Sequence, residues 1–249
     1  MADRSTIEWT EATWNPTSGC DRVSAGCDHC YALTLAKRLK AMGQAKYQLD
    51  GDPRTSGPGF GLALHPDTLA IPYQWHQPRV VFVNSMSDLF HPDVPEDFID
   101  SVFAVMRSCP QHTFQILTKR SKRLADLGGA LDWPPNVWMG VSIESDSYVF
   151  RADHLCTVPA HVRFVSIEPM IGPVPSLDVT RMDWIIVGGE SGPRSRPIEK
   201  AWVRDVRDRC HVARVPFFFK QWGGRTPKAG GRVLDGRTWD DMPSRMSVG

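Results

Sequence analysis

The distribution of hydrophobic and polar residues divides most of the chain into two kinds of segment. Short, nearly continuous apolar runs alternate with longer segments in which apolar residues recur every three or four positions. The short runs are typical of strands that are buried on both faces, and the longer segments are typical of helices that cover a sheet. The pattern predicts an α/β protein with a mostly parallel sheet, either covered on both faces or curled into a barrel.

The segments can be given boundaries. The six predicted strands are 6–16, 79–83, 113–117, 137–141, 162–167 and 184–187, and a further strand at 216–219 would make seven. The predicted helices are 31–42, 96–108, a short one ending at 127, 148–154 and 198–213. An open sheet of the Rossmann type is the alternative, although the glycine-rich stretch 188–192 does not match G-x-G-x-x-G.

Length and composition indicate one domain, residues 1–249. A chain of 249 residues of which 41% are hydrophobic can bury a single large core. Residues 43–78 are rich in Gly and Pro and interrupt the alternation of strands and helices. We therefore expect an irregular insertion there, and long loops of this kind in compact domains are usually functional or disordered.

Polar or charged residues follow nearly every predicted strand. In parallel barrels the active-site groups collect at this carboxyl end of the strands. The sequence therefore places its candidate site there. The words that follow the strands are Asn84-Ser85-Met86-Ser87-Asp88, Thr118-Lys119-Arg120, Ser142-Ile143-Glu144, Glu168-Pro169, Gly188-Gly189-Glu190 and Lys220-Gln221-Trp222.

Three of the six cysteines lie in the cysteine loop, which we define as residues 19–31. Cys20, Cys27 and Cys30 have the spacing C-x6-C-x2-C. Three thiolates without a fourth suit a cubane iron–sulfur cluster that leaves one iron open. A structural zinc site is the alternative, and it would need a fourth ligand such as His29 or Cys109. The scattered cysteines (Cys109, Cys156 and Cys210) and the lack of a secretory signal argue against disulfides, and we expect these three to be small buried residues.

The cysteine loop, between a strand and a helix and with an aromatic residue beside its last Cys, resembles the radical S-adenosylmethionine superfamily. The usual spacing there is C-x3-C-x2-C, so this chain has three extra residues between the first two cysteines. The words Trp14-Asn15-Pro16-Thr17-Ser18-Gly19-Cys20 and Phe217-Phe218-Phe219-Lys220-Gln221-Trp222-Gly223 also resemble an uncharacterised group of phage and bacterial proteins assigned to that superfamily. This second resemblance covers nearly the whole chain but brings no established reaction.

The resemblance implies a fold, two cofactors and a reaction type. The fold would be a partial (β/α)6 barrel of the TIM type. The cofactors would be a 4Fe-4S cluster on Cys20, Cys27 and Cys30 and S-adenosylmethionine bound to its open iron. One electron from a reductase, flavodoxin or ferredoxin would cleave S-adenosylmethionine to a 5′-deoxyadenosyl radical, which abstracts hydrogen from a substrate.

The resemblance also suggests residues for S-adenosylmethionine. The superfamily often uses Gly-Gly-Glu after its second strand for the methionine amino group, and here that word is replaced by one that offers Asn84, Ser85 and Asp88. Asp88 could equally cap the turn that follows. The further candidates are Ser142, Glu144 and Glu168 for the ribose and methionine groups, and His29 for the adenine.

Basic residues after several strands bear on the substrate. Lys119, Glu190 and Lys220 are the candidate catalytic residues, and they would contact the reacting substrate. A basic mouth with aromatic residues would suit a nucleic-acid or nucleotide-like substrate, although solvated loop residues are the plainer interpretation. The net charge of +1 allows only a local basic patch. The basic residues concerned are Lys119, Arg120, Lys122, Arg123, Arg194, Arg196 and Lys220.

Two function classes are therefore open. The first is a radical S-adenosylmethionine enzyme that modifies or repairs nucleic acid, and the second is a nucleic-acid-binding protein stabilised by zinc or by an inert cluster. The iron and zinc content of the protein would distinguish them. The sequence contains no run of about 18 apolar residues, so we expect no membrane-spanning helix. Its first residues are polar and do not resemble a signal peptide. We therefore expect a cytoplasmic protein.

Overall fold

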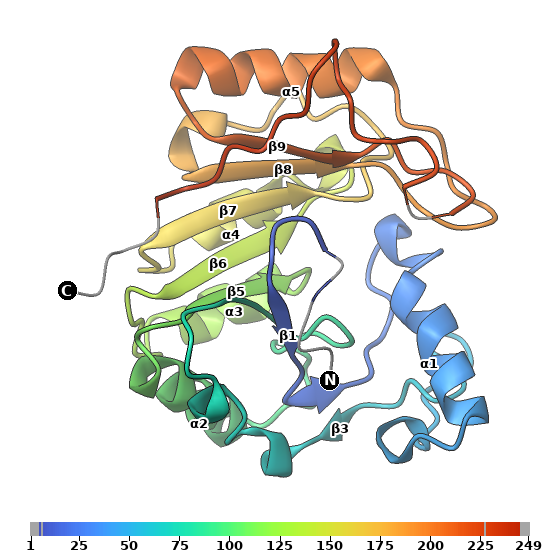
Figure 1. The fold of residues 1–249 in the computed structure, drawn as a ribbon, viewed down its shortest axis with the longest axis vertical. Helices are drawn as coiled ribbons and strands as arrows, with labels where there is room; N and C mark the ends of the chain where they lie inside the picture. Colours follow the sequence, from blue (N-terminus) through green and yellow to red (C-terminus); the bar gives the residue numbers. More distant parts are fainter. Residues whose placement is uncertain (1–4, 6, 227, 245–249) are drawn as a thin grey trace.

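A computed structural model describes residues 5, 7–226 and 228–244. Its main sheet contains seven strands, all parallel, and their spatial order follows the order of the sequence (Figure 1). The sheet curls into a half-barrel, so the predicted partial barrel and the seventh strand are confirmed. The strands are β1 (Ala12–Trp14), β4 (Val80–Val83), β5 (Thr113–Thr118), β6 (Val137–Ser142), β7 (Val162–Ile167), β8 (Trp184–Gly188) and β9 (Phe217–Gln221).

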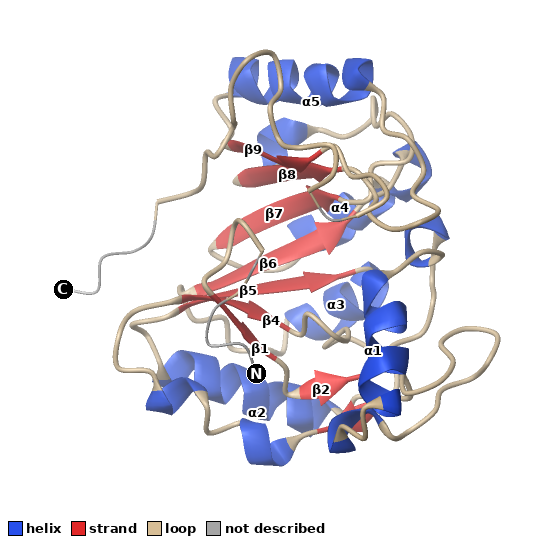
Figure 2. Cartoon of the chain, turned by 45° about the vertical axis from the view of Figure 1, so that its right-hand side comes forward, coloured by secondary structure: helices blue, strands red, loops and turns tan. Residues whose placement is uncertain are grey.

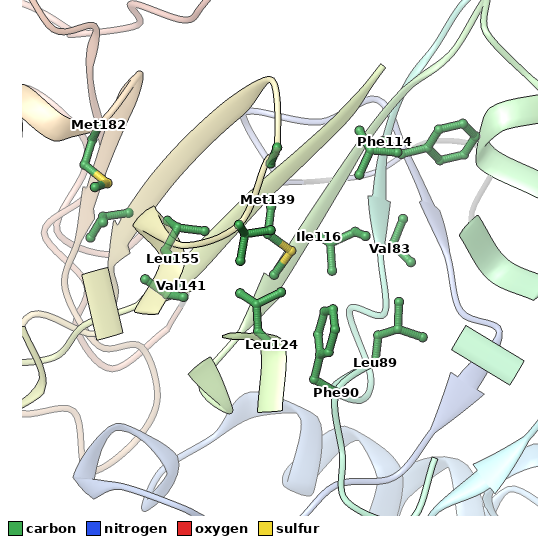
Figure 3. Packing of buried hydrophobic residues seen from close by; sticks show 14 of the residues in the cluster. Val83, Leu89, Phe90, Phe114, Ile116, Leu124, Met139, Val141, Leu155 and Met182 are labelled. Carbon is green, nitrogen blue, oxygen red and sulfur yellow. The ribbon is translucent and has the colours of Figure 1, made fainter. Parts of the chain in front are cut away.

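Four helices pack against the convex face of the sheet. Their apolar residues form one cluster with the outward-facing residues of the strands, and Figure 3 shows Leu124 and Leu155 from two of these helices beside Met139 and Val141 of β6. The connection from β7 to β8 has only the 3-10 turn η6 (Val179–Arg181) in place of an α-helix. The helices are α2 (Glu96–Ser108), α3 (Ser121–Gly128), α4 (Phe150–Cys156) and α5 (Lys200–Ala213).

Aromatic rings fill the amino-terminal part of the concave face. Side chains alternate between the two faces of a strand, and inward-facing residues of β4, β6, β7, β8 and β9 contribute to this inner cluster. The Trp184 ring lies at its centre, with four neighbouring ring centroids at 5.5–6.1 Å. The four neighbours are Trp9, Trp138, Phe164 and Phe218.

The first strand is much shorter than predicted, because the residues before Ala12 pack inside the half-barrel and do not pair with β4. Of the predicted range 6–16, only Ala12–Trp14 pairs with β4. Trp9 instead turns into the half-barrel, where its ring centroid lies 4.8 Å from that of Phe82 on β4 and 6.1 Å from that of Trp184 on β8. The segment before β1 therefore plugs the amino end of the open sheet.

The insertion at 43–78 contains short elements but no α-helix. Strand β3 (Ala63–Leu64) pairs antiparallel with β2 (Thr17–Ser18), and three 3-10 turns follow the course of the loop. The insertion lies directly behind the start of the cysteine loop: a Cβ on Gly19 (φ +87°) would come within 2.1 Å of the Gly61 carbonyl oxygen. Only glycine fits that position. The 3-10 turns are η2 (Ala45–Tyr47), η3 (Pro66–Thr68) and η4 (Pro72–Gln74).

Within the part of the chain that the structure describes, no helix is both long and apolar enough to cross a lipid bilayer.

Candidate functional site

The cysteine loop lies across the carboxyl ends of the strands. It leaves β2 at Gly19, passes through the 3-10 turn η1 (Ala25–Cys27) and enters α1 (Tyr31–Ala41), which stands at the side toward which the strand arrows point (Figures 1 and 2). Side chains that follow β5, β6 and β8 hold the loop in place. The loop therefore covers the edge at which parallel half-barrels collect their functional groups.

The three loop cysteines are free thiols and partly buried. Burial raises the pKa of Cys20 to about 12, although the nearby Arg120 acts in the opposite direction. Burial also raises the pKa of Cys30, although hydrogen bonds from two backbone N–H groups and the charge of Lys119 act to lower it. Cys27 lies close enough to both for its charge to raise their pKa further. Without metal, Cys20 is a protonated thiol at neutral pH, and a soft metal would have to displace that proton.

The described residues do not form a ready-made site for a single metal ion. Among residues 5, 7–226 and 228–244, no three His, Cys, Asp or Glu side chains are grouped as around a bound metal ion. The assignment of Cys20, Cys27 and Cys30 as cluster ligands stays a prediction.

Arg120 joins the cysteine loop to the ends of β4 and β5. Its Nη1 donates to Cys20 Sγ at 3.2 Å and to Asp88 Oδ2 at 3.1 Å, and its Nη2 donates to the Asp21 carbonyl oxygen at 3.1 Å. Asp88 also accepts from the hydroxyl of Thr118 at 2.7 Å. Asp88 was a candidate for the methionine amino group, and the structure uses its carboxylate to hold Arg120.

Glu144 holds the middle of the loop. Its fully buried carboxylate accepts from Ser24 Oγ at 2.6 Å and from Arg151 Nη1 at 2.9 Å. The same Arg151 nitrogen donates to the carbonyl oxygen of Ser142, at the end of β6. A Cβ on Gly26 would lie 2.3 Å from Glu144 Cγ, so the loop approaches this carboxylate as closely as a backbone can.

Glu190, which follows β8, holds the last part of the loop. Its carboxylate lies 3.0 Å from His29 Nδ1 and accepts two side-chain hydrogen bonds from Arg196. Arg196 Nη2 also reaches the Ala25 carbonyl oxygen at 2.8 Å. Despite the burial of Glu190, the hydrogen bonds from Arg196 and His29 lower its pKa to about 2. Glu190 and His29 therefore contact each other in the structure.

Glu168 and Lys220 form a further pair, between the anchors on β6 and β8. Lys220 Nζ lies 2.5 Å from Glu168 Oε1, and both side chains are about one-fifth exposed. The Tyr31 ring belongs to the same region, because the charges of Cys30 and Glu168 both act on its phenol. Its hydroxyl donates to the carbonyl oxygen of Ser85 at 2.5 Å.

Asn84 has a left-handed backbone conformation, and one of its two side-chain polar atoms has no hydrogen-bond partner. Its φ of +62° is tolerated by Asn better than by most residues. Its Oδ1 accepts from the Thr17 N–H at 3.3 Å, whereas its buried Nδ2 has no hydrogen-bond partner. Ser85 donates its hydroxyl to Asn15 Oδ1 at 3.2 Å and so links the end of β4 to the end of β1.

Two further buried polar side chains on the strands lack partners. Both amide atoms of Gln115 and the hydroxyl of Ser166 are unpaired, and both residues are fully buried. In the sheet register Gln115 lies opposite Phe82 and Trp138, and Ser166 lies opposite Ile186. These neighbours belong to the inner cluster, so Gln115 and Ser166 lie on the concave face. Buried polar groups normally have a partner, and a polar ligand on this face would supply one.

Most of the predicted basic mouth is already paired. Arg120, Arg196 and Lys220 bind carboxylates, and Arg123 donates to the His91 and Val94 carbonyl oxygens. Lys122 pairs with Asp126 one turn along α3. Among the residues described, Lys119 and Arg194 are the members of the predicted set whose side chains have neither an ion pair nor a hydrogen bond. The field at the mouth is therefore weaker than a count of basic residues indicates.

Sequence reasoning alone does not single out Ser24, Gln115, Arg151 and Ser166. A repeated tripeptide could have pointed to Ser166: Ser-Ile-Glu occurs at 142–144 and again at 166–168, each time at the end of a strand. A third tripeptide, Gly-Gly-Glu at 188–190, lies at the end of the next strand. Each word puts a carboxylate just beyond its strand. Gln115 carries no such signal, because one amide in an apolar strand does not reveal whether it has a partner.

Comparisons with known proteins give a family and a set of distant structures. A model of the family described as "Protein of unknown function (DUF5131)" matches residues 4–243. No match was found among curated proteins. The solved structure "Spore photoproduct lyase complexed with dinucleoside spore photoproduct" aligns with a TM-score of 0.41 at 11% identity, over 78% of this chain and 59% of that chain.

Two mutants of the same lyase give similar values. One aligns with a TM-score of 0.45 at 12% identity, over 84% of this chain and 63% of that chain. The other, solved with AdoMet and dinucleoside spore photoproduct bound, aligns with a TM-score of 0.42 at 11% identity, over 79% and 60% of the two chains. The chain thus spans about three-fifths of the length of these lyase chains.

Proposed function

The chain belongs to the DUF5131 family of proteins of unknown function, and we propose that it is a radical S-adenosylmethionine enzyme. In this proposal Cys20, Cys27 and Cys30 hold a 4Fe-4S cluster, and S-adenosylmethionine binds between the cysteine loop and the concave face of the sheet. The observation that carries the proposal is the position of three free thiols on one loop across the carboxyl ends of a parallel half-barrel.

The chemistry of the loop suits such a cluster. Three thiols can ligate three irons and leave one iron open. Arg120 beside Cys20 and Lys119 near Cys30 would offset the negative charge of the bound cluster. When bound and reduced, the cluster would supply the electron that cleaves S-adenosylmethionine. A flavodoxin, ferredoxin or reductase is the class of protein that would deliver this electron.

The concave face suits a polar cofactor. Asn84 Nδ2 can donate to a carboxylate or hydroxyl oxygen, and Ser166 and Gln115 can each donate and accept. Glu168 at the same end of the sheet would favour the cationic sulfonium. The cysteine loop excludes water from above, since Glu144 and Glu190 fasten it to two strands. Ser142, in contrast, offers Arg151 its backbone carbonyl, so its contribution would be to place the loop anchor.

We also propose a nucleic-acid or nucleotide-like substrate in the cytoplasm. The support is local: Lys119 and Arg194 have no ion pair in the described structure, and the aromatic Trp222 comes directly after β9, the strand that carries Lys220. Lys119, Glu190 and Lys220 stay the candidates for contact with the substrate. Glu190 and Lys220 would first have to exchange their present partners, Arg196 and Glu168.

The test is metal analysis followed by a cofactor assay. Anaerobically purified protein should be brown and contain about four irons with labile sulfide per chain. After reduction by dithionite, S-adenosylmethionine should alter the electron-spin spectrum and be cleaved slowly to 5′-deoxyadenosine. A variant with Cys20, Cys27 and Cys30 all changed to Ser is the control. Colourless protein with one zinc, or a reduced cluster whose spectrum ignores S-adenosylmethionine, would contradict the proposal.

A further inference from the structure

Arg120 stands between a candidate cluster ligand and a buried carboxylate. One nitrogen, Nη1, lies 3.2 Å from Cys20 Sγ and 3.1 Å from Asp88 Oδ2. The side chains of Arg120 and Asp88 are both only 8% exposed. An ion pair that is shielded from water interacts more strongly than a surface pair. The charge of this guanidinium therefore acts directly on the sulfur.

The surroundings fix both members of the pair. Asp88 accepts from the Thr118 hydroxyl at 2.7 Å and from the backbone N–H groups of Lys119 at 3.2 Å and Phe90 at 3.0 Å. Arg120 Nη2 is bound to the Asp21 carbonyl oxygen at 3.1 Å. The guanidinium cannot turn away from Cys20 without breaking several hydrogen bonds. The structure thus sets the position of the charge before any ligand is bound.

A fixed cation beside a cluster sulfur has a defined electrostatic effect. Hydrogen bonds to the sulfurs and nearby charge are among the factors that set the reduction potential of an iron–sulfur cluster. A reduced cluster carries one more negative charge than an oxidised one, so a cation stabilises the reduced state more. The anionic Asp88 has the opposite effect, and its distance from the sulfur makes that effect smaller.

We propose that Arg120, held in place by Asp88, raises the reduction potential of the cluster through Cys20 and so makes it easier to reduce. The inference rests on the proposed function, because it needs a cluster on Cys20. Arg120 is then a positioning residue that acts through the sulfur. Its present contacts are to Cys20, to Asp88 and to a backbone oxygen, so it needs no contact with substrate for this role.

The experiment measures the reduction potential of four variants by titration followed by electron-spin resonance. Arg120→Met should lower the potential, because it removes the cation and leaves Asp88 uncompensated. At a fixed potential near the wild-type midpoint, we expect the ratio of reduced to oxidised cluster to fall at least about tenfold, which is about 59 mV for a one-electron couple. Asp88→Asn, which keeps the cation, should raise the potential.

The remaining two variants are controls. Arg120→Met combined with Asp88→Asn removes a neutral pair, so its potential should return toward the wild-type value. Lys122→Met removes an equal charge from an exposed position on α3 that contacts Asp126 and no cysteine, so its potential should not change. If the two residues had a purely structural role, Arg120→Met and Asp88→Asn would shift the reduction potential in the same direction. If their role is electrostatic, the two variants shift the reduction potential in opposite directions.

The outcomes separate the inference from the function on which it rests. If the wild-type protein holds no iron, the proposed function fails. If it holds a cluster but Arg120→Met and Lys122→Met have the same potential, the inference alone is overturned. If Arg120→Met loses its iron, Asp88→Asn decides: a raised potential supports the inference, and an unchanged or lowered one overturns it.

Discussion

The two ends of the strands in this half-barrel carry different kinds of side chain: aromatic residues at the amino end and charged residues at the carboxyl end. At the amino end of the concave face, Trp184 is surrounded by four aromatic rings, of which three lie edge to face with it and that of Phe164 is tilted. At the carboxyl end, three successive strands are each followed by a carboxylate, and each carboxylate holds a cation: Glu144 with Arg151, Glu168 with Lys220, and Glu190 with Arg196. Apolar packing is thus concentrated at the first end and charged side chains at the second, and the second is the end at which parallel barrels generally carry their functional groups.

The carboxyl end holds both paired and unpaired polar side chains. The three carboxylates have partners, whereas Asn84 Nδ2, just beyond β4, and the side chains of Gln115 and Ser166 on the concave face have none in the described structure. Glu144 and Glu190 hold the cysteine loop through Ser24 and His29. The predictions that follow test whether the two ends can be changed independently.

The largest effect is expected from the loop cysteines. Changing Cys20, Cys27 or Cys30 to Ala should remove the iron, because two thiolates cannot hold the cluster that three would hold. Cys109 and Cys210 are buried among apolar residues of the helical layer, and their replacement by Ala should leave the iron content unchanged. Iron per chain is the measurement. Loss of iron in the Cys109 variant, with the loop intact, would contradict the assignment.

A comparably large effect on stability, without an effect on the site, is expected at the amino end. Trp184→Ala removes the central ring of the inner cluster and should lower the free energy of unfolding by about 3–5 kcal/mol. Trp184→Phe keeps much of the packing and should cost less. Both are measured by denaturant titration. Iron per folded chain should stay at the wild-type value, and a drop in it would show that the two ends are coupled.

A smaller effect, and one that depends on pH, is expected at Glu190. Glu190→Gln weakens the charge-assisted hydrogen bonds from Arg196 and His29 and should lower the free energy of unfolding by about 1–3 kcal/mol at neutral pH. Because folding lowers the pKa of Glu190 from 4.5 to about 2, this contribution is fully present above pH 4.5 and is lost as the pH falls toward 2.

The measurement is the difference in unfolding free energy between wild type and Glu190→Gln across this pH range. The difference should shrink toward pH 2. Asp100→Asn, at an exposed position on α2, is the control and should show little pH dependence. A difference that stays constant from pH 7 to pH 2 would show that the charge of Glu190 does not hold the loop.

The smallest effect is expected from the two unpaired cations at the mouth. Lys119→Ala and Arg194→Ala should each reduce the slope of log affinity against log salt for short DNA or RNA by about one. Their iron content should not change. Wild-type protein that binds neither DNA nor RNA at low salt would remove the support for a nucleic-acid substrate, and a peptide or small metabolite would then be the better hypothesis.

The fold could be predicted closely because strands and helices depend on local periodicity. Helix α2 covers the predicted range 96–108, and β7 covers the predicted range 162–167. The start of the first strand could not be predicted, because Trp9 looks like a strand residue in its own neighbourhood. Its position is decided by Phe82 and Trp184, which lie far along the chain.

The candidate site could be predicted only in outline. Residues after strands were expected to gather at one edge, and Glu144, Glu168 and Glu190 do so. The partners of these residues could not be read from the sequence. Arg120 and Lys220 look like free surface cations, yet each is held by a carboxylate from a distant part of the chain: Asp88 comes after β4, and Glu168 comes after β7. Pairing of this kind is a property of the tertiary structure.

The position of Trp9 has a consequence for how the protein is made. Its ring packs against residue 184, and the loop that follows it is fastened by Glu190 and Arg196. Domains are usually synthesised and folded from the amino-terminal side, but here the segment around Trp9 and the cysteine loop cannot complete their contacts until β8 and Arg196 have left the ribosome. The thiols of the loop therefore stay open to oxidation for the interval between their own synthesis and that of residues 184–196.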